Sequence, residues 1–264
     1  MGVLHELIDL VFPVHCLCCD RPGALWCLGC QPAAGPRLVT PRRQDGRAAP
    51  GVPPVHASGE YAGELRTVLL AFKERGRRQL AGRLADYLGD AVDAAVRAAG
   101  PGASPVLVPV PSARRAARTR GGDHVLRLAR LVERRHAVPV LPAVRLAGPV
   151  RDSAGLSVGE RRRNLAGRMV AGPPPPGLHP VLVDDIVTSG TTLAEAARAL
   201  VAAGWTGPGA AVVAATRLRR DPAANRAYDD PAAGIQPAAR GPPAGSRSRC
   251  RVRQVQLGRT SPRR

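Results

Sequence analysis

The segment VLVDDIVTSGTT, residues 181–192, decides the fold of this chain. The apolar run at 181–183 predicts a buried strand that ends in two carboxylates, Asp184 and Asp185. The small residues after it predict a loop, and the apolar spacing over 193–203 predicts that this loop opens a helix. Such a loop offers backbone N–H groups and hydroxyls to a phosphate, while adjacent acids can hold a sugar diol or its magnesium ion. We therefore expect a sugar-phosphate cradle here.

The residues around this segment alternate between helix and strand signals. Apolar residues recur at helical intervals over 64–99 and are interrupted around Gly76, which predicts two helices. The remaining signals predict, in chain order, a strand at 106–110, a helix at 123–135, a strand at 138–146, a short strand at 169–171 and a last strand at 210–216. This alternation implies an α/β fold, with a mostly parallel sheet flanked by helices and ligands bound at the carboxyl ends of its strands.

Composition shifts divide the chain into four parts. Residues 1–32 hold an expected amphipathic helix, which Pro13 ends, and a cysteine cluster. Residues 33–54 are dense in Pro, Gly and Arg, which predicts a linker. The α/β domain then covers 55–217, and the stretch 218–264 has no periodicity, which predicts a disordered basic tail.

Composition also limits the class of protein. Aromatic residues make up only 3% of the chain, so the core has to be built from Val, Leu, Ile and Ala. No apolar run approaches the ~20 residues that a membrane-spanning helix needs. Glu6 and Asp9 stand where a signal peptide would carry basic residues. We expect a cytoplasmic protein without membrane insertion.

The net charge of +19 is unevenly distributed. Residues 217–264 contain twelve arginines against three aspartates, which is nearly half of the excess. Lys73 is the only lysine among 39 basic residues, a skew that indicates coding bias more than a surface built for phosphates. The charge therefore predicts a weak, salt-sensitive attraction to polyanions, and not specific nucleic-acid binding.

Four cysteines form two C-x-x-C pairs separated by seven residues: Cys16, Cys19, Cys27 and Cys30. In a cytoplasmic protein this pattern favours a tetrahedral Zn2+ site over disulfides. Reduced thiols without a metal remain the alternative, and Cys18 or His15 could replace one ligand. In so small a module we expect the metal to be structural and to stand in for a hydrophobic core.

The central motif has two interpretations. Because side chains alternate along a strand, Asp184 and Asp185 should lie on opposite faces, so that one can point at a ligand and the other at metal or loop. Gly190 permits a turn that a side chain would block, and the motif has no lysine, so it is not a Walker loop. The alternative is that the acids cap the next helix and the hydroxyl residues form a polar turn. The complete string of strand, acid pair, loop and helix favours the ligand.

This motif resembles a known signature. Residues 183–192 are similar to the phosphoribosyl-pyrophosphate motif of type I phosphoribosyltransferases, and flanking segments resemble the competence-associated ComF family of that superfamily. The matches are VPVP at 108–111, the Arg-Gly at 120–121 that opens the family's RGFN segment, the L…ER…NL pattern from 156 to 165, and the N-terminal cysteines. Gly122 and Asp123 depart from RGFN, and Ser153 stands where many members carry Gln. The likeness covers about residues 1–217.

The resemblance implies a substrate and roles for residues. Asp184 and Asp185 would contact the ribose hydroxyls of phosphoribosyl pyrophosphate, and Mg2+ would bridge its pyrophosphate and ribose. Its 5-phosphate would lie on the loop residues Thr188, Ser189, Gly190, Thr191 and Thr192. Three arginines complete the expected site, namely Arg114 at the pyrophosphate and Arg120 and Arg161 in the matched motifs. Lys73 fits the family's Y…L…K pattern and could reach a phosphate, although a solvated lysine is the simpler interpretation.

Two functions follow from the resemblance. The first is a Mg2+-dependent phosphoribosyltransferase that uses phosphoribosyl pyrophosphate as donor to an unknown base or amine acceptor, with a link to competence and DNA uptake. The second is a non-catalytic module that senses phosphoribosyl pyrophosphate or a nucleotide and engages DNA or DNA-uptake proteins. Thr188 bears on the mechanism, because purine-salvage relatives carry an acid at its place and threonine cannot transfer a proton at neutral pH. Orotate-type relatives also carry threonine, so this residue does not exclude catalysis, and it leaves the acceptor unidentified.

Overall fold

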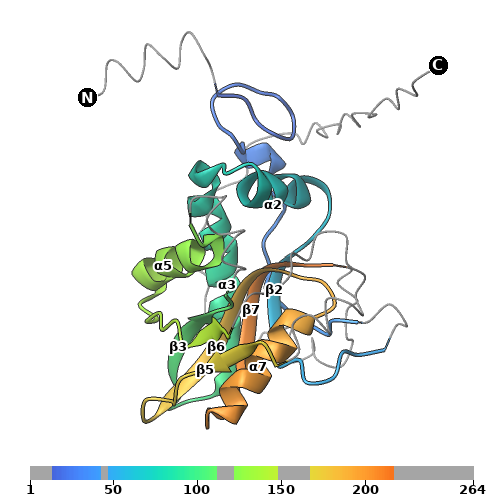
Figure 1. The fold of residues 1–264 in the computed structure, drawn as a ribbon. Helices are drawn as coiled ribbons and strands as arrows, with labels where there is room; N and C mark the ends of the chain where they lie inside the picture. Colours follow the sequence, from blue (N-terminus) through green and yellow to red (C-terminus); the bar gives the residue numbers. More distant parts are fainter. Residues whose placement is uncertain (1–13, 43–46, 112–121, 148–166, 217–264) are drawn as a thin grey trace, which may run out of the picture. The chain divides into compact units, whose positions relative to one another are not determined.

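The computed structural model describes residues 14–42, 47–111, 122–147 and 167–216. The described part of the chain divides into two compact units, one that ends at Gln31 and one that begins at Pro32. The second unit is the α/β body (Figure 1). The expected first helix, the segments that carry Arg114, Arg120 and Arg161, and the expected tail all lie outside the described residues.

The α/β body is built on a five-stranded sheet of order β1-β2-β7-β6-β3. Four of its strands run parallel, namely β2 (Val55–Glu60), β7 (Gly209–Ala215), β6 (Leu178–Val187) and β3 (Ser104–Pro109). β1 (Arg37–Val39) pairs antiparallel with β2 at one edge. The mostly parallel α/β fold predicted from the alternation of elements is therefore confirmed, with β6 in the interior of the sheet as expected.

Helices cover both faces of this sheet. Between β2 and β3 the chain forms α2 (Gly63–Glu74), the 3-10 helix η2 (Arg78–Leu80) and α3 (Ala81–Ala99), which confirms two helices with a break near Gly76. α5 (His124–His136) and α7 (Thr191–Ala202) follow. α3 packs on β2, β7 and β6 and against α5, whereas α7 packs on β6 from the opposite face.

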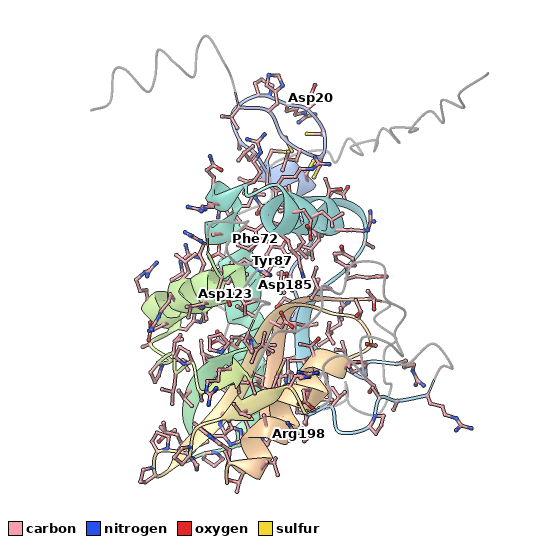
Figure 2. All side chains as sticks on the ribbon, viewed as in Figure 1. Asp20, Phe72, Tyr87, Asp123, Asp185 and Arg198 are labelled. Atoms are coloured by element: carbon pink, nitrogen blue, oxygen red, sulfur yellow. The ribbon has the colours of Figure 1, made fainter. Side chains whose placement is uncertain are left out.

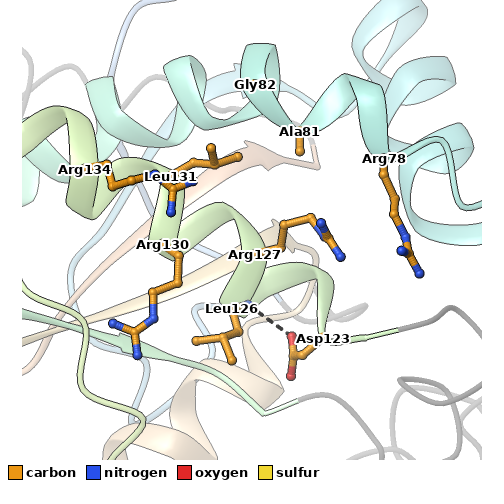
Figure 3. Close-up of a pocket in the computed structure, with 9 residues that line it drawn as sticks. All are labelled: Arg78, Ala81, Gly82, Asp123, Leu126, Arg127, Arg130, Leu131 and Arg134. Carbon is orange, nitrogen blue, oxygen red and sulfur yellow. Dashed lines mark hydrogen bonds between the residues drawn. The ribbon is translucent and has the colours of Figure 1, made fainter.

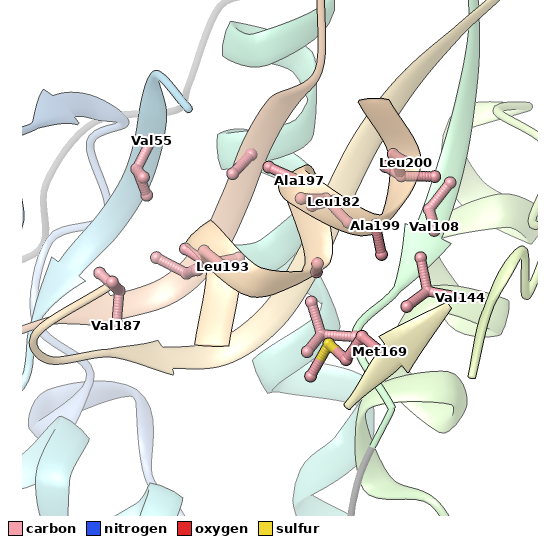
Figure 4. Close-up of a cluster of buried hydrophobic side chains, with 14 of the residues drawn as sticks. Val55, Val108, Val144, Met169, Leu182, Val187, Leu193, Ala197, Ala199 and Leu200 are labelled. Atoms are coloured by element: carbon pink, nitrogen blue, oxygen red, sulfur yellow. The ribbon is translucent and has the colours of Figure 1, made fainter. Parts of the chain in front are cut away.

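The core between α7 and the sheet is aliphatic, as the low aromatic content predicted. Leu193 and Leu200 of α7 lie in one buried cluster with Leu182 of β6, Val108 of β3 and Val55 of β2 (Figure 4). All five side chains are at most 1% exposed. Burying apolar side chains so fully contributes about 1.5–3 kcal/mol for each, and it fixes the start of α7 against the end of β6.

The strand expected at 138–146 is shorter in the structure. Only β4 (Val144–Leu146) forms, and it pairs antiparallel with β5 (Met169–Ala171) in a separate two-stranded sheet. The earlier part of the stretch makes a single parallel bridge, between Val140 and Leu107 of β3. Pro139 and Pro142 have no backbone N–H to donate, so a continuous ladder cannot form there.

The stretch 33–54, for which composition predicts a linker, contains β1. Val39 of this strand is 7% exposed and belongs to the core cluster of the α/β body. None of the helices in the described ranges is long and apolar enough to cross a membrane.

Candidate functional site

The carboxyl end of β6 extends beyond its neighbour β3. The pairing of these strands ends at Pro109 and Val183, whereas β6 stays paired with β7 as far as Val187 and Ala215. Residues 184–187 are therefore flanked by a strand on one side only. In parallel sheets, ligands bind at carboxyl ends of this kind.

Asp184 and Asp185 lie on opposite faces of the sheet at this point. Alternation places Asp184 on the same face as Leu182, which packs against α7. Its side chain is half-buried, and its Oδ1 accepts a hydrogen bond from the backbone N–H of Asp185 at 2.8 Å. Burial and the neighbouring Asp185 carboxylate raise the pKa of Asp184 well above its ordinary value. Asp184 is thus the carboxylate on the α7 side.

Asp185 points to the other face and is 1% exposed. Its Oδ2 lies 2.9 Å from Nζ of Lys73 and 2.9 Å from Nε2 of His124, and its Oδ1 accepts from the backbone N–H of Ile186 at 2.8 Å. Figure 2 shows Asp185 at the end of the sheet. Burial by itself raises the pKa of Asp185, but the charge of Lys73 and the hydrogen bond from His124 outweigh it and hold the pKa well below its usual range.

The two partners of Asp185 come from different helices. Lys73 lies in the last turn of α2, and His124 is the first residue of α5. The imidazole of His124 is 9% exposed and meets the Phe72 ring edge-on at 6.2 Å. Its buried Nδ1 has no hydrogen-bond partner among the described residues. One carboxylate therefore joins α2 and α5 to β6, as a structural anchor would.

The loop between β6 and α7 depends on glycine. Gly190 has φ +73°, and a Cβ there would lie 2.7 Å from Cγ2 of Val52 and 3.0 Å from Cβ of Pro41. Gly190 is the N-cap of α7, and no side-chain hydrogen bond caps the helix. Nearby, Ser189 Oγ and Thr191 Oγ1 are 2.9 Å apart. The first N–H groups of α7, with these hydroxyls, can therefore receive an anion.

The structure thus brings part of the predicted site together. Asp184 and the residues 188–192 lie at the carboxyl end of β6, with Thr188 exposed and Ser189, Thr191 and Thr192 half-buried. Arg114, Arg120 and Arg161 lie outside the described residues.

Sequence reasoning missed the Lys73–Asp185–His124 cluster. The sequence left Lys73 either solvated or near a phosphate, and it gave no role to His124. Two signals were present, since Lys73 is the only lysine in an arginine-rich chain and His124 follows closely on the matched Arg120-Gly121.

A second ion pair, between the buried Glu195 and the exposed Arg198, connects the small sheet to α7. Glu195 is 8% exposed, accepts from the backbone N–H of Met169 at 3.2 Å, and lies 2.7 Å from Nη2 of Arg198. Arg198 also donates to the Met169 carbonyl at 2.8 Å. Because β4 and β5 pair at Leu146 and Met169, the described residues on either side of 148–166 lie next to each other.

The first unit brings its cysteine sulfurs together. The Sγ atoms of Cys16, Cys19, Cys27 and Cys30 all lie within 4.8 Å of one another, and the five described cysteines form no disulfide with each other. A backbone turn positions each C-x-x-C pair. The backbone N–H of Asp20 donates to the Cys16 carbonyl at 2.9 Å, and the backbone N–H of Cys30 donates to the Cys27 carbonyl at 3.0 Å. Four sulfurs in this arrangement could hold a structural Zn2+. Cys18 and His15 are not part of the group.

The electrostatics of Cys16 also suit a metal, whereas burial and the hydrogen bond with Cys19 raise the pKa of Cys27. Burial raises the pKa of Cys16, but hydrogen bonds from the backbone N–H groups of Cys27, Cys18 and Cys19 outweigh it and lower the pKa to about 6. A zinc ligand must be a thiolate, so a thiol that ionises near neutral pH suits this role.

No protein-family model matches this chain, and no curated protein matches it either.

Proposed function

We propose that the protein binds phosphoribosyl pyrophosphate with Mg2+ and transfers its ribose 5-phosphate to a nitrogenous acceptor, as a ComF-like type I phosphoribosyltransferase. The proposal is carried by one observation: Asp184 and the start of α7 lie together at the carboxyl end of β6. A carboxylate beside an uncapped helix start offers a place for a diol next to a place for a phosphate.

Different residues bind different parts of phosphoribosyl pyrophosphate in this proposal. Asp184 accepts hydrogen bonds from the ribose hydroxyls, and the hydroxyl residues with the first N–H groups of α7 hold the 5-phosphate. Asp185 is already bound by Lys73 and His124, so its role is to position the end of β6 and not to touch the sugar. This differs from the roles that the family resemblance implies, in which both carboxylates contact ribose.

The transfer step follows from this arrangement. The bond from carbon 1 to the pyrophosphate oxygen breaks and pyrophosphate leaves with the electron pair, while the acceptor nitrogen forms the new bond to carbon 1. The proton that the acceptor nitrogen loses passes to the departing pyrophosphate or to water. The carboxylate of Asp184 stabilises the positive charge that develops on the ribose ring. Mg2+ would neutralise the departing pyrophosphate, and as an ion that keeps water and substrate phosphates as ligands it needs few protein oxygens.

A sensing module is the second candidate, and the exposed hydroxyl of Thr188 favours it, because threonine cannot act as a base at neutral pH. In that case the pocket binds the same donor without turnover, and the protein engages DNA or DNA-uptake proteins. The two candidates share the donor site and differ in pyrophosphate release.

The test compares a carboxylate of the proposed site, Asp184, with a carboxylate outside it, Glu60. With Mg2+ present, Asp184→Asn should weaken the binding of phosphoribosyl pyrophosphate, measured by calorimetry, by about tenfold or more, which corresponds to about 1.4 kcal/mol. Glu60→Gln, at an exposed acid that ends β2, should bind as the wild type does. Equal affinity in Asp184→Asn and wild type refutes the site.

Turnover is measured separately, as pyrophosphate released in the presence of a panel of bases and amines. Acceptor-dependent release supports the transferase. Donor binding without release by any acceptor supports the sensing module.

A further inference from the structure

A groove with a volume of about 550 Å3 lies between the start of α3 and the exposed side of α5 (Figure 3). Four arginines line it: Arg78 of η2 and Arg127, Arg130 and Arg134 of α5. Half-buried Leu126 and Leu131 supply apolar surface between them. The proposed donor site does not include these residues, because it faces α7 on the other side of the sheet.

The groove is strongly positive. Asp123 is the one acid among the described lining residues, and its Oδ1 already caps α5 by accepting from the N–H groups of Val125 and Leu126 at 2.9 and 3.1 Å. Arg130 is held by Glu133 of the same helix, with its Nη1 2.9 Å from Oε2. Neither Arg127 nor Arg134 forms an ion pair with any described residue.

Two features of these arginines favour an added negative charge, although one acid, Glu133, already interacts with Arg130 and Arg134. Arg127, Arg130 and Arg134 are spaced by three and four residues, so they share one face of α5 and repel one another. Arg127 also lies in the first turn of the helix, where the helix dipole disfavours a cation. An anion in the groove would relieve both effects.

We infer that this groove binds a nucleotide-sized oligophosphate, either a nucleoside triphosphate or an inorganic oligophosphate. Its volume falls in the range of about 300–1,000 Å3 that is usual for small-molecule sites, whereas a nucleic-acid backbone needs an extended track. The arginines on its two walls suit a chain of phosphates, and the two leucines suit the apolar part of a nucleotide. The inference does not depend on the proposed donor chemistry.

The test uses the full chain and removes equal charge from two places. The variant Arg127→Gln with Arg134→Gln changes the groove, and Arg37→Gln with Arg145→Gln changes exposed arginines of β1 and β4. ATP, tripolyphosphate and a thymidine oligonucleotide are titrated against both variants and the wild type at fixed ionic strength. All four substituted side chains are exposed, so the fold should be retained in both variants.

In the groove variant, the affinity for ATP or tripolyphosphate should fall about tenfold or more, because two charge-assisted contacts are lost. The control variant and Asp184→Asn should bind these anions as the wild type does. Tighter binding of ATP than of tripolyphosphate identifies a nucleotide, and equal binding identifies an inorganic oligophosphate.

Three results would overturn the inference. The groove and control variants could lose affinity equally, which would assign binding to net charge. Asp184→Asn could abolish the binding of both small anions, which would assign it to the donor site. The oligonucleotide alone could depend on the groove, which would make this surface a nucleic-acid interface.

Discussion

At the scale of single residues, Asp185 shows how a buried charge is tolerated. Removing a carboxylate from water is costly, and a lone one at 1% exposure would be protonated. Lys73 and His124 offset that cost and keep Asp185 ionised. The fixed carboxylate then holds the backbone of the next residue, Ile186, through its N–H. Asp185 thereby fixes the backbone next to Asp184, the carboxylate that we propose contacts the ligand.

Lys73→Met tests this anchor. The variant leaves the buried Asp185 carboxylate without its cation, and the free energy of unfolding should fall by about 3 kcal/mol. Urea denaturation followed by circular dichroism measures the change. Arg77→Met removes an exposed charge four residues further on and should change stability by less than about 0.5 kcal/mol. If the two variants are equally stable, the ion pair does not hold the fold.

The contribution of the Asp185–Lys73 ion pair should also appear in the pH dependence of the free energy of unfolding. Because the folded-state pKa of Asp185 is lowered, its contribution is present above the ordinary carboxyl pKa of about 3.9 and is lost as the pH falls below it. The stability difference between wild type and Lys73→Met should therefore be largest at neutral pH, where Asp185 is ionised in the wild type, and should shrink towards pH 3. Asp184 has a raised pKa and contributes the opposite slope, so both chains are best compared in an Asp184→Asn background. A difference that grows as the pH falls would contradict the assignment.

At the scale of elements, the connection from β6 to α7 positions the residues of the proposed donor site, and Gly190 is the most tightly packed residue of this connection. Two demands meet there: a left-handed backbone and close contact with Val52 and Pro41. Only the first could be inferred from the sequence, because the partners lie in a stretch that composition assigns to a linker.

Gly190→Ala and Gly177→Ala separate these two demands. Gly177 has φ +74° and nothing within 4 Å of an added Cβ, so its substitution costs only backbone strain, about 1 kcal/mol. Gly190→Ala adds overlap with Val52 and should cost about 1–3 kcal/mol more. Thermal unfolding of the two variants measures the difference. Equal losses would show that contact with Val52 is unimportant.

Local sequence patterns predicted most helices and strands of the α/β body. They did not predict the ion-pair partners of Asp185, which lie far from it in the sequence. The helix expected at 123–135 forms at His124–His136, because a capping aspartate and apolar periodicity are local signals. The length of the strand expected at 138–146 was overestimated, because the prediction gave more weight to the apolar residues than to the two prolines. The partners of Asp185 are 61 and 112 residues away in the chain, and no pattern within a short window reports such contacts.

At the scale of the whole molecule, each compact unit contains one of the two tryptophans. Trp26 lies among the cysteines of the first unit and donates to the Cys30 carbonyl at 3.0 Å. Trp205 lies in the α/β body, is 2% exposed and donates to the Gly172 carbonyl at 2.8 Å. Fluorescence can therefore follow the units separately, in Trp26→Phe and Trp205→Phe chains.

Removal of metal should affect the two signals differently. We propose that the four cysteines bind Zn2+ and that this ion holds the first unit together, because so short a segment has little core of its own. A strong chelator should release about one zinc per chain and change the Trp26 signal, leaving the Trp205 signal unchanged. Cys19→Ser should give the same Trp26 signal without chelator, whereas Cys18→Ser should not. Full retention of zinc by Cys19→Ser would refute the four-cysteine site.

The ion pair of Lys73 also has a use in chemical labelling. The chain offers amine-selective reagents a single side chain, and that ammonium is 29% exposed and bound to Asp185. A protonated amine is a poor nucleophile, so acylation at this position is slow while the contact persists. The yield of one modified peptide in mass spectrometry thus reports how often the end of α2 separates from the sheet.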